Sequence, residues 1–146
     1  MKPLTIQAHR VPSAGANDAP RLVVPLVSGR EVVVAGAILE GAFETEAGTL
    51  LVTTDDVPFE EIVHLVLLRR GAVRDQWDIG FPYTPGTVSG LLATRGTLVF
   101  SFADQRFRVT ASERGRFVLP GSAPAEARRG VAPWRRAHIL VENISE

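Results

Sequence analysis

Apolar residues recur along the chain in short runs that are separated by Gly, Pro, Asp and Asn. Short alternating runs bounded by such residues are typical of β-strands. The pattern predicts an all-β, mostly antiparallel single domain, a sandwich or barrel of about eight to ten strands with at most short helical turns. We expect β-rich segments at residues 4–11, 21–27, 30–44, 48–54, 96–102, 105–113, 115–121 and 137–144, tight turns at 103–105 and 113–115, and a surface loop at 121–133.

The stretch TTDDVPFEEIVHLVLLRRG, residues 53–71, leaves two structures open. As a helix it would bring Glu60 and His64 onto one face, because residues four apart are neighbours on a helix. A β-hairpin over residues 61–79 accounts for more of the sequence, because IVHLVLL is apolar on every side and the chain after the turn alternates. In that hairpin Glu61 and His64 point to opposite faces of the strand. One face of the second strand carries Val73, Asp75, Trp77 and Ile79.

The composition is that of one ordinary globular domain. The chain has 146 residues, of which 45% are hydrophobic and 22% are charged, and this suits a single hydrophobic core. No apolar run approaches the roughly 18 residues that a membrane span needs. The N-terminal residues lack the apolar core of a signal peptide, and the chain has no Cys. We therefore expect a cytoplasmic protein with no membrane contact.

Charge is segregated along the chain although its net value is zero. Residues 1–63 hold nine acids and four bases, a net charge of −5, and residues 64–146 hold seven acids and twelve bases, a net charge of +5. Between Glu31 and Glu61 there are eight acids and no Lys or Arg. An acidic segment of this kind favours binding to a basic partner, because it steers the encounter and pairs with Lys and Arg.

Motifs for catalysis or metal binding are absent from the sequence. The three histidines, His9, His64 and His138, are far apart, and there is no HExxH, CxxC or GxSxG motif. Paired acids in the region of Glu44 to Glu61 resemble a glycosidase pair only in residue type, and the low aromatic content of 7% favours a solvated acidic loop instead. We expect a protein that is not an enzyme and has no cofactor and no metal.

Two groups of residues are candidates for binding. The first is acidic, and we expect it to face a basic partner protein: Glu44, Glu46, Asp55, Asp56, Glu60 and Glu61. The second combines arginines with an aromatic ring, as single-stranded nucleic-acid binding does. Overall neutrality makes nucleic acid the less favoured partner, and a solvated basic loop anchored by its tryptophan is the simpler interpretation. This second group is Arg128, Arg129, Trp134, Arg135 and Arg136.

The stretch LLVTTDDVPFEEIVHLVLL, residues 50–68, followed by a hairpin and the pair GTLVFSF and RFRV, resembles small bacterial β proteins. Some of these are immunity proteins of toxin–immunity loci, including those of contact-dependent growth inhibition. The resemblance implies a cytosolic protein that binds one cognate toxin domain and blocks its active site. It also implies that the six acidic residues face the toxin.

The function expected from the sequence is therefore that of a non-catalytic immunity or antitoxin protein that binds a basic, nuclease-like toxin domain through an acidic surface. Two alternatives stay open. One is a small-ligand-binding β-barrel or an enzyme, with a polar group such as His64 in an enclosed pocket. The other is a nucleic-acid binding module that uses the Arg/Trp loop. The oligomeric state also stays open.

Overall fold

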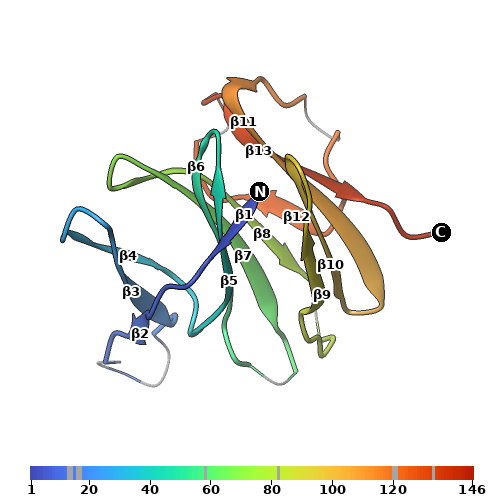
Figure 1. Ribbon diagram of the computed structural model, residues 1–146. Helices are drawn as coiled ribbons and strands as arrows, with labels where there is room; N and C mark the ends of the chain where they lie inside the picture. The colour runs from blue at the N-terminus through green and yellow to red at the C-terminus, as the bar shows by residue number, and fades with distance from the viewer. Residues whose placement is uncertain (13–14, 16–17, 58, 82, 120–121, 133) are drawn as a thin grey trace.

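The computed structural model is an all-β structure of three antiparallel sheets that pack in layers (Figure 1). It describes residues 1–12, 15, 18–57, 59–81, 83–119, 122–132 and 134–146. Thirteen strands are assigned within these residues, and no described residue is in a helix. The described part of the chain thus offers no helix that could cross a membrane. Of the two predicted architectures, the structure has the sandwich.

The central sheet has six strands and supports both candidate binding regions. The chain runs up and down through four neighbouring strands, β5 to β8, and every pairing in the sheet is antiparallel. In spatial order the strands are β1 (Lys2–Leu4), β5 (Ile38–Thr45), β6 (Gly48–Thr54), β7 (Ile62–Arg69), β8 (Ala72–Gly80) and β12 (Ala127–Arg129).

The central sheet is covered on both faces. A four-stranded sheet lies on one side, and a smaller three-stranded sheet lies on the other (Figure 1). The four-stranded sheet consists of β13 (Ala137–Asn143), β11 (Gln105–Arg116), β10 (Thr97–Phe102) and β9 (Ser89–Ala93); the three-stranded sheet consists of β2 (His9–Arg10), β3 (Arg21–Pro25) and β4 (Glu31–Ala35).

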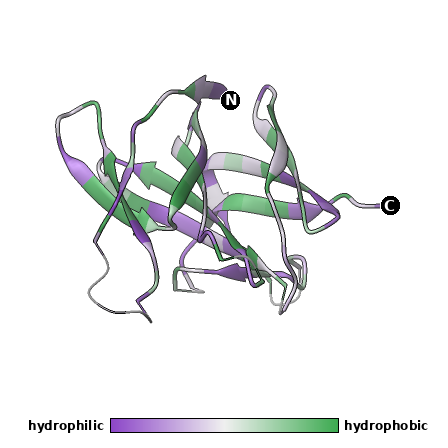
Figure 2. Ribbon diagram, turned by 90° about the horizontal axis from the view of Figure 1, so that it is seen from below, coloured by the Kyte–Doolittle hydropathy of each residue, from purple (hydrophilic) through white to green (hydrophobic). Residues whose placement is uncertain are grey.

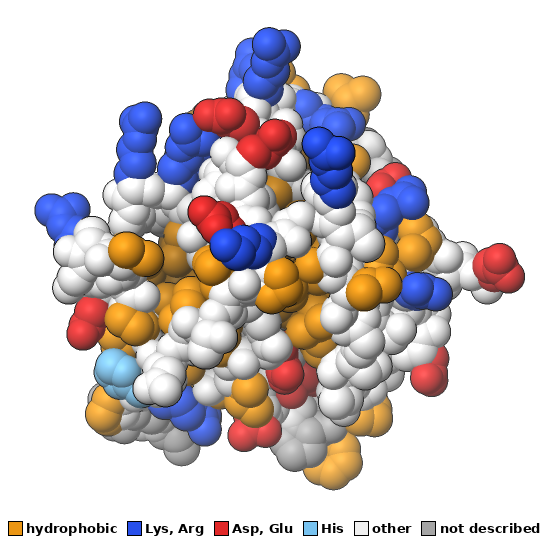
Figure 3. Space-filling view, viewed as in Figure 1, with side chains coloured by type: hydrophobic (Ala, Val, Ile, Leu, Met, Phe, Trp, Pro, Cys, Tyr) orange, Lys and Arg blue, Asp and Glu red, His pale blue; other side chains and the backbone are white. Residues whose placement is uncertain are grey.

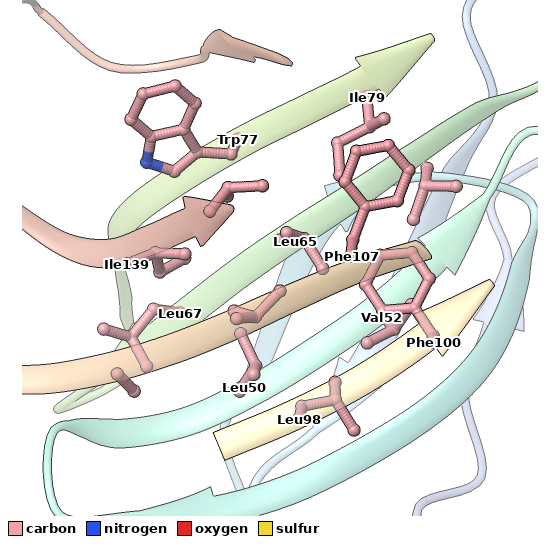
Figure 4. Close-up of a cluster of buried hydrophobic side chains, with 14 of the residues drawn as sticks. Leu50, Val52, Leu65, Leu67, Trp77, Ile79, Leu98, Phe100, Phe107 and Ile139 are labelled. Atoms are coloured by element: carbon pink, nitrogen blue, oxygen red, sulfur yellow. The ribbon is translucent and has the colours of Figure 1, made fainter. Parts of the chain in front are cut away.

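The main core lies between the central and the four-stranded sheets (Figure 4). Buried and more exposed residues alternate along β8 and β10, so these strands turn their apolar side inward, as the change of hydropathy along the ribbon illustrates (Figure 2). The rings of Phe100 and Phe107 stack at a centroid distance of 5.7 Å. Full burial of each large apolar side chain stabilises the fold by about 1.5–3 kcal/mol. This core includes Leu50, Val52, Leu65, Leu67, Trp77, Ile79, Leu98, Phe100, Phe107 and Ile139.

A second apolar cluster lies between the central and the three-stranded sheets. It contains Leu51 and Val66 of the central sheet and Leu22, Val24 and Val34 of the small sheet. Because β6 and β7 are buried on both faces, they need apolar residues at nearly every position. This explains why the runs LLV and IVHLVLL do not alternate.

The predicted hairpin is confirmed, and a β-bulge sets which of its residues face the core. Leu68 pairs with Val73 but Leu67 pairs with Asp75, so Arg74 is an extra residue on β8. Without this insertion every residue of β8 after Val73 would turn to the opposite face. The bulge therefore allows Trp77, with Asp75, to point into the main core.

Two local predictions were wrong. The expected turn at residues 113–115 lies inside β11, where Gly115 adopts φ +69° and the pairing with β13 shifts register. Gly115 bends the strand as a bulge does, since glycine adopts positive φ without a steric penalty. No strand follows over residues 117–119, and Phe117 is exposed there.

The segment 121–133 was expected to be a surface loop, and part of it is a strand. β12 (Ala127–Arg129) pairs with the edge of β8, where its backbone groups find hydrogen-bond partners. Residues 121 and 133 lie outside the described residues. The structure thus adds a sixth strand to the central sheet next to the hairpin.

Candidate functional site

The acidic loop, residues 55–61, connects β6 to β7 and is held by its last residue. The Glu61 side chain is buried, and its Oε1 atom accepts backbone N–H groups from Asp55 (2.7 Å), Asp56 (3.1 Å) and Ile62 (3.1 Å). A carboxylate that accepts several N–H groups forms strong, charge-assisted hydrogen bonds. Glu61 therefore fastens both ends of the acidic loop to each other.

The loop is also held by an Asp–His–Asp arrangement on the central sheet. His64 of β7 is 6% exposed, and its Nε2 lies 2.7 Å from Oδ1 of Asp55. Its Nδ1 lies 2.7 Å from Oδ1 of Asp78, the residue that pairs with it across β7 and β8. Gln76 donates a further hydrogen bond to the same oxygen at 3.0 Å. The first loop residue is thus bound to the sheet by a buried ion pair.

His64 is protonated at neutral pH in this environment. Burial lowers its pKa, but the hydrogen bonds to Asp55 and Asp78 and the charges of both carboxylates outweigh burial and raise the pKa to about 9. Burial tends to raise the pKa of Asp78, yet its hydrogen bonds to His64 and Gln76 lower it below the usual value. An imidazolium with both N–H groups engaged has no lone pair to accept a proton or bind a metal. The arrangement is therefore suited to holding the loop.

Among the described residues, no group of three or more His, Cys, Asp or Glu side chains is arranged to hold a metal ion. Three surface hollows have volumes of about 890, 780 and 580 Å³, and His64 lines none of these three. The smallest of the three lies beside the acidic loop and is lined by Asp55 and Asp56 together with Arg10 and Arg21. His64, the polar residue expected in an enclosed ligand pocket, is instead hydrogen-bonded to Asp55 and Asp78.

The acidic loop presents an aromatic ring between acidic side chains. Phe59 is 78% exposed, and Val57 is also exposed. The neighbouring Asp56 and Glu60 are exposed as well, and Asp56 has a positive φ of 59°. The acidic loop thus places one exposed ring between two exposed acids, on a backbone whose two ends are held.

The six acidic residues proposed for partner binding do not lie on one surface. Asp56 and Glu60 are exposed on the loop, whereas Glu61 is buried and Asp55 is bound to His64. Glu44 and Glu46 are exposed near the turn between β5 and β6, at the other end of β6. Seven residues of extended chain separate the two ends by about 20 Å. The exposed acids of this sequence span therefore lie at opposite ends of β6.

The predicted arginine and tryptophan group is also divided. Arg128 is exposed, and it pairs in register with Asp78 on the face that carries His64. Arg129 points inward, where its Nε lies 3.3 Å from Oδ1 of Asp75. Trp134 is 77% exposed and so does not anchor its loop in the core. Of the remaining two, Arg135 is exposed, and Arg136 lies over the ring of Phe117 at 5.1 Å.

Asp75, like Asp78, is a structurally important acid that belongs to neither of the two candidate groups predicted from the sequence. It has no exposed surface, and its Oδ2 accepts the backbone N–H groups of His138 (2.8 Å) and Ile139 (2.9 Å) on β13. Its Oδ1 accepts from the backbone of Gln76 at 3.0 Å as well as from Arg129. The available signal was its place beside Trp77 on the apolar face of β8, where an acid must find buried partners.

Comparison of the chain with protein-family models, with curated proteins and with solved structures finds no match.

Proposed function

We propose that this protein is a non-catalytic binding protein that uses the acidic loop to bind a basic protein partner. The observation that carries the proposal is the exposure of Phe59 on a loop held by two buried charged groups, Glu61 and His64. In the bound state Phe59 enters an apolar pocket of the partner. Asp56 and Glu60 then pair with Lys or Arg side chains around that pocket.

Preorganisation of the acidic loop favours binding on this proposal. Binding costs free energy when loops must be ordered, and a loop whose two ends are already held avoids part of that cost. Few residues carry most of the free energy of an interface, and they are mainly large side chains that become fully buried. Exposed acidic residues around such an anchor increase the association rate with a basic partner more than the final affinity.

Immunity to a nuclease-like toxin is the biological role that we propose for this activity. A nuclease domain has a basic active site because its substrate is a polyanion, and an acidic loop with an apolar anchor is complementary to such a site. The same role is what the resemblance noted for residues 50–68 implies. On this proposal the protein works in the cytoplasm, where the toxin would reach nucleic acid.

The direct test is to produce the protein together with the product of its neighbouring gene and to measure their dissociation constant by calorimetry. We expect a complex at low ionic strength, and we expect Phe59→Ala to weaken it by about 2 kcal/mol or more. The double variant Asp56→Asn, Glu60→Gln should reduce the association rate and its salt dependence. Failure to form any complex at low salt would contradict the proposal.

Two matched variants serve as controls. Tyr83 is an exposed aromatic residue outside the acidic loop, and Glu46 is an exposed acid at the other end of β6. Tyr83→Ala and Glu46→Gln should leave the dissociation constant unchanged. An equal loss of affinity in Phe59→Ala and Tyr83→Ala would show that exposed aromatics in general, and not this loop, bind the partner.

A further inference from the structure

The end of the central sheet opposite the acidic loop carries an arginine cluster. A hollow of about 430 Å³ lies beside the β7–β8 turn, and every charged side chain among the residues that line it is an arginine. Figure 3 shows Lys and Arg side chains, with several Asp and Glu among them, over the upper part of the molecule, where this turn and β11 lie in Figure 1. The arginine cluster is Arg69, Arg70, Arg74 and Arg135.

Local backbone structure places three of these arginines side by side. Arg70 and Gly71 form the β7–β8 turn with φ values of +53° and +77°, so Arg70 occupies a conformation that favours Gly or Asn. The bulge at Arg74 inserts one more arginine next to the turn. Arg74 donates to the backbone oxygen of Glu113 at 3.0 Å, and Arg69 pairs with the Glu113 carboxylate at 2.9 Å.

The fourth arginine is held in place by the buried Asp75. Arg129, whose Nε contacts Asp75, also donates from Nη1 to the backbone oxygen of Arg135. Asp75 further accepts from His138 on β13, so both ends of the segment 130–137 are attached to β8. That segment presents Trp134, 77% exposed, directly before Arg135 in the chain. A second exposed ring, Phe117, lies under the Arg136 guanidinium.

Positive charge in the cluster is incompletely neutralised. Among the described residues no carboxylate forms an ion pair with Arg70, Arg74 or Arg135, and Glu113 pairs with Arg69 alone. Burial and then the charge of Arg69 lower the pKa of Arg74; the Glu113 carboxylate opposes this shift, and the charge of Arg70 adds to it. Like charges at such proximity repel one another, and an anion bound between them removes that repulsion.

We propose that the arginine cluster and Trp134 form a binding site for single-stranded nucleic acid, in which phosphates contact the arginines and an unpaired base stacks on the Trp134 ring. Exposed aromatic rings next to arginines suit single strands, because bases in a duplex are already stacked and cannot reach a ring. The site lies at the other end of β6 from the acidic loop, so it is independent of the function proposed above. Three of its five residues, Arg69, Arg70 and Arg74, come from the hairpin.

The test is fluorescence anisotropy of a labelled oligothymidylate of about 12 nucleotides, with the salt concentration varied from about 25 to 300 mM. Each phosphate that is neutralised in a single strand contributes about −0.7 to the slope of log K against log salt. We expect the double variant Arg70→Gln, Arg135→Gln to reduce that slope by about 1.4. We expect Trp134→Ala to weaken binding about tenfold while leaving the slope unchanged.

Arg30→Gln is the matched control, because Arg30 is an exposed arginine in the turn between β3 and β4 of the three-stranded sheet. It should bind as the unchanged protein does. An equal loss in Arg30→Gln and in the double variant would overturn the proposal. So would equal affinity for a duplex of the same length, or equally effective competition by inorganic polyphosphate, because neither ligand offers an unpaired base. Absence of binding at the lowest salt would also overturn it.

Discussion

Asp75 on β8 accepts the backbone N–H of Ile139 on β13 at 2.9 Å. This hydrogen bond joins the central sheet to the four-stranded sheet, and the Asp75 side chain has no exposed surface. The same carboxylate is the counter-charge of Arg129. A buried charge that loses its partner keeps its desolvation cost and loses the attraction that offset it.

Asp75→Asn is therefore expected to lower the free energy of unfolding by about 3–5 kcal/mol, since Asn leaves the Arg129 guanidinium without a counter-charge. Urea denaturation measures this loss. Asp104→Asn is the control, because Asp104 is an exposed turn residue with φ +61°, a conformation that Asn adopts readily. A loss below about 1 kcal/mol in Asp75→Asn would contradict this account of Asp75.

Stability should fall in mildly alkaline solution because of His64. Its pKa is raised from 6.5 to about 9 in the folded protein, so its contribution is fully present below pH 6.5 and is lost as the pH rises through about 9. The shift corresponds to about 3 kcal/mol. Denaturation between about pH 6 and pH 10 should show this loss, and His64→Gln should be less stable at pH 6 and lack most of the slope.

The control for this pH dependence is His9→Gln, because His9 is an exposed histidine on β2. It should retain the slope of the unchanged protein. If His64→Gln lost stability between the same pH values as steeply as the unchanged protein does, the ion pair with Asp55 and Asp78 would not be the cause.

Neighbouring acids in the acidic loop should respond differently to truncation. Glu61→Ala removes the acceptor of three backbone N–H groups, and we expect it to destabilise the protein by about 1–3 kcal/mol and to accelerate amide hydrogen exchange at Asp55 and Asp56. Glu60→Ala removes an exposed side chain and should change stability by less than about 0.5 kcal/mol. Similar exchange rates in both variants would mean that Glu61 does not hold the loop.

Gly48 should tolerate no side chain at the start of β6. Its φ is +134°, and a Cβ atom there would lie 2.1 Å from the backbone oxygen of Leu68, which pairing within the sheet holds in place. We expect Gly48→Ala to cost about 2–4 kcal/mol in thermal or urea denaturation. Gly96 has φ +84° with no atom within 4 Å of such a Cβ, so Gly96→Ala should cost only about 1 kcal/mol.

The hairpin was predictable because its evidence is local. The apolar run in β7 and the alternation in β8 are visible in the sequence, and the turn at Arg70 and Gly71 separates them. The pairing of His64 with Asp78 was not predictable, because a regular hairpin closed by that turn would pair His64 with Trp77. The bulge at Arg74 shifts the register by one residue, and burial of Trp77 in the main core is what requires the shift.

The arrangement of the candidate sites could not be predicted, because a sequence pattern does not show which side chains are buried or which distant segments meet. Glu60 and Glu61 are adjacent and chemically alike, yet one is exposed and the other is buried as a hydrogen-bond acceptor. Similarly, Arg69 and Arg135 line one hollow although 66 positions separate them. Side-chain direction in loops and contacts between distant segments are set by the packed fold, whereas residue type and period are local.

The hydrogen bonds of Asp75 also bear on how the chain is synthesised. Its partners on β12 and β13 lie 54 to 64 positions later in the sequence. While a ribosome is still extending the chain, Asp75 has no means of being buried without cost, and water must continue to solvate it. We therefore expect the sandwich to close around this residue only after residue 139 has emerged, and we expect earlier intermediates to leave that side of β8 exposed.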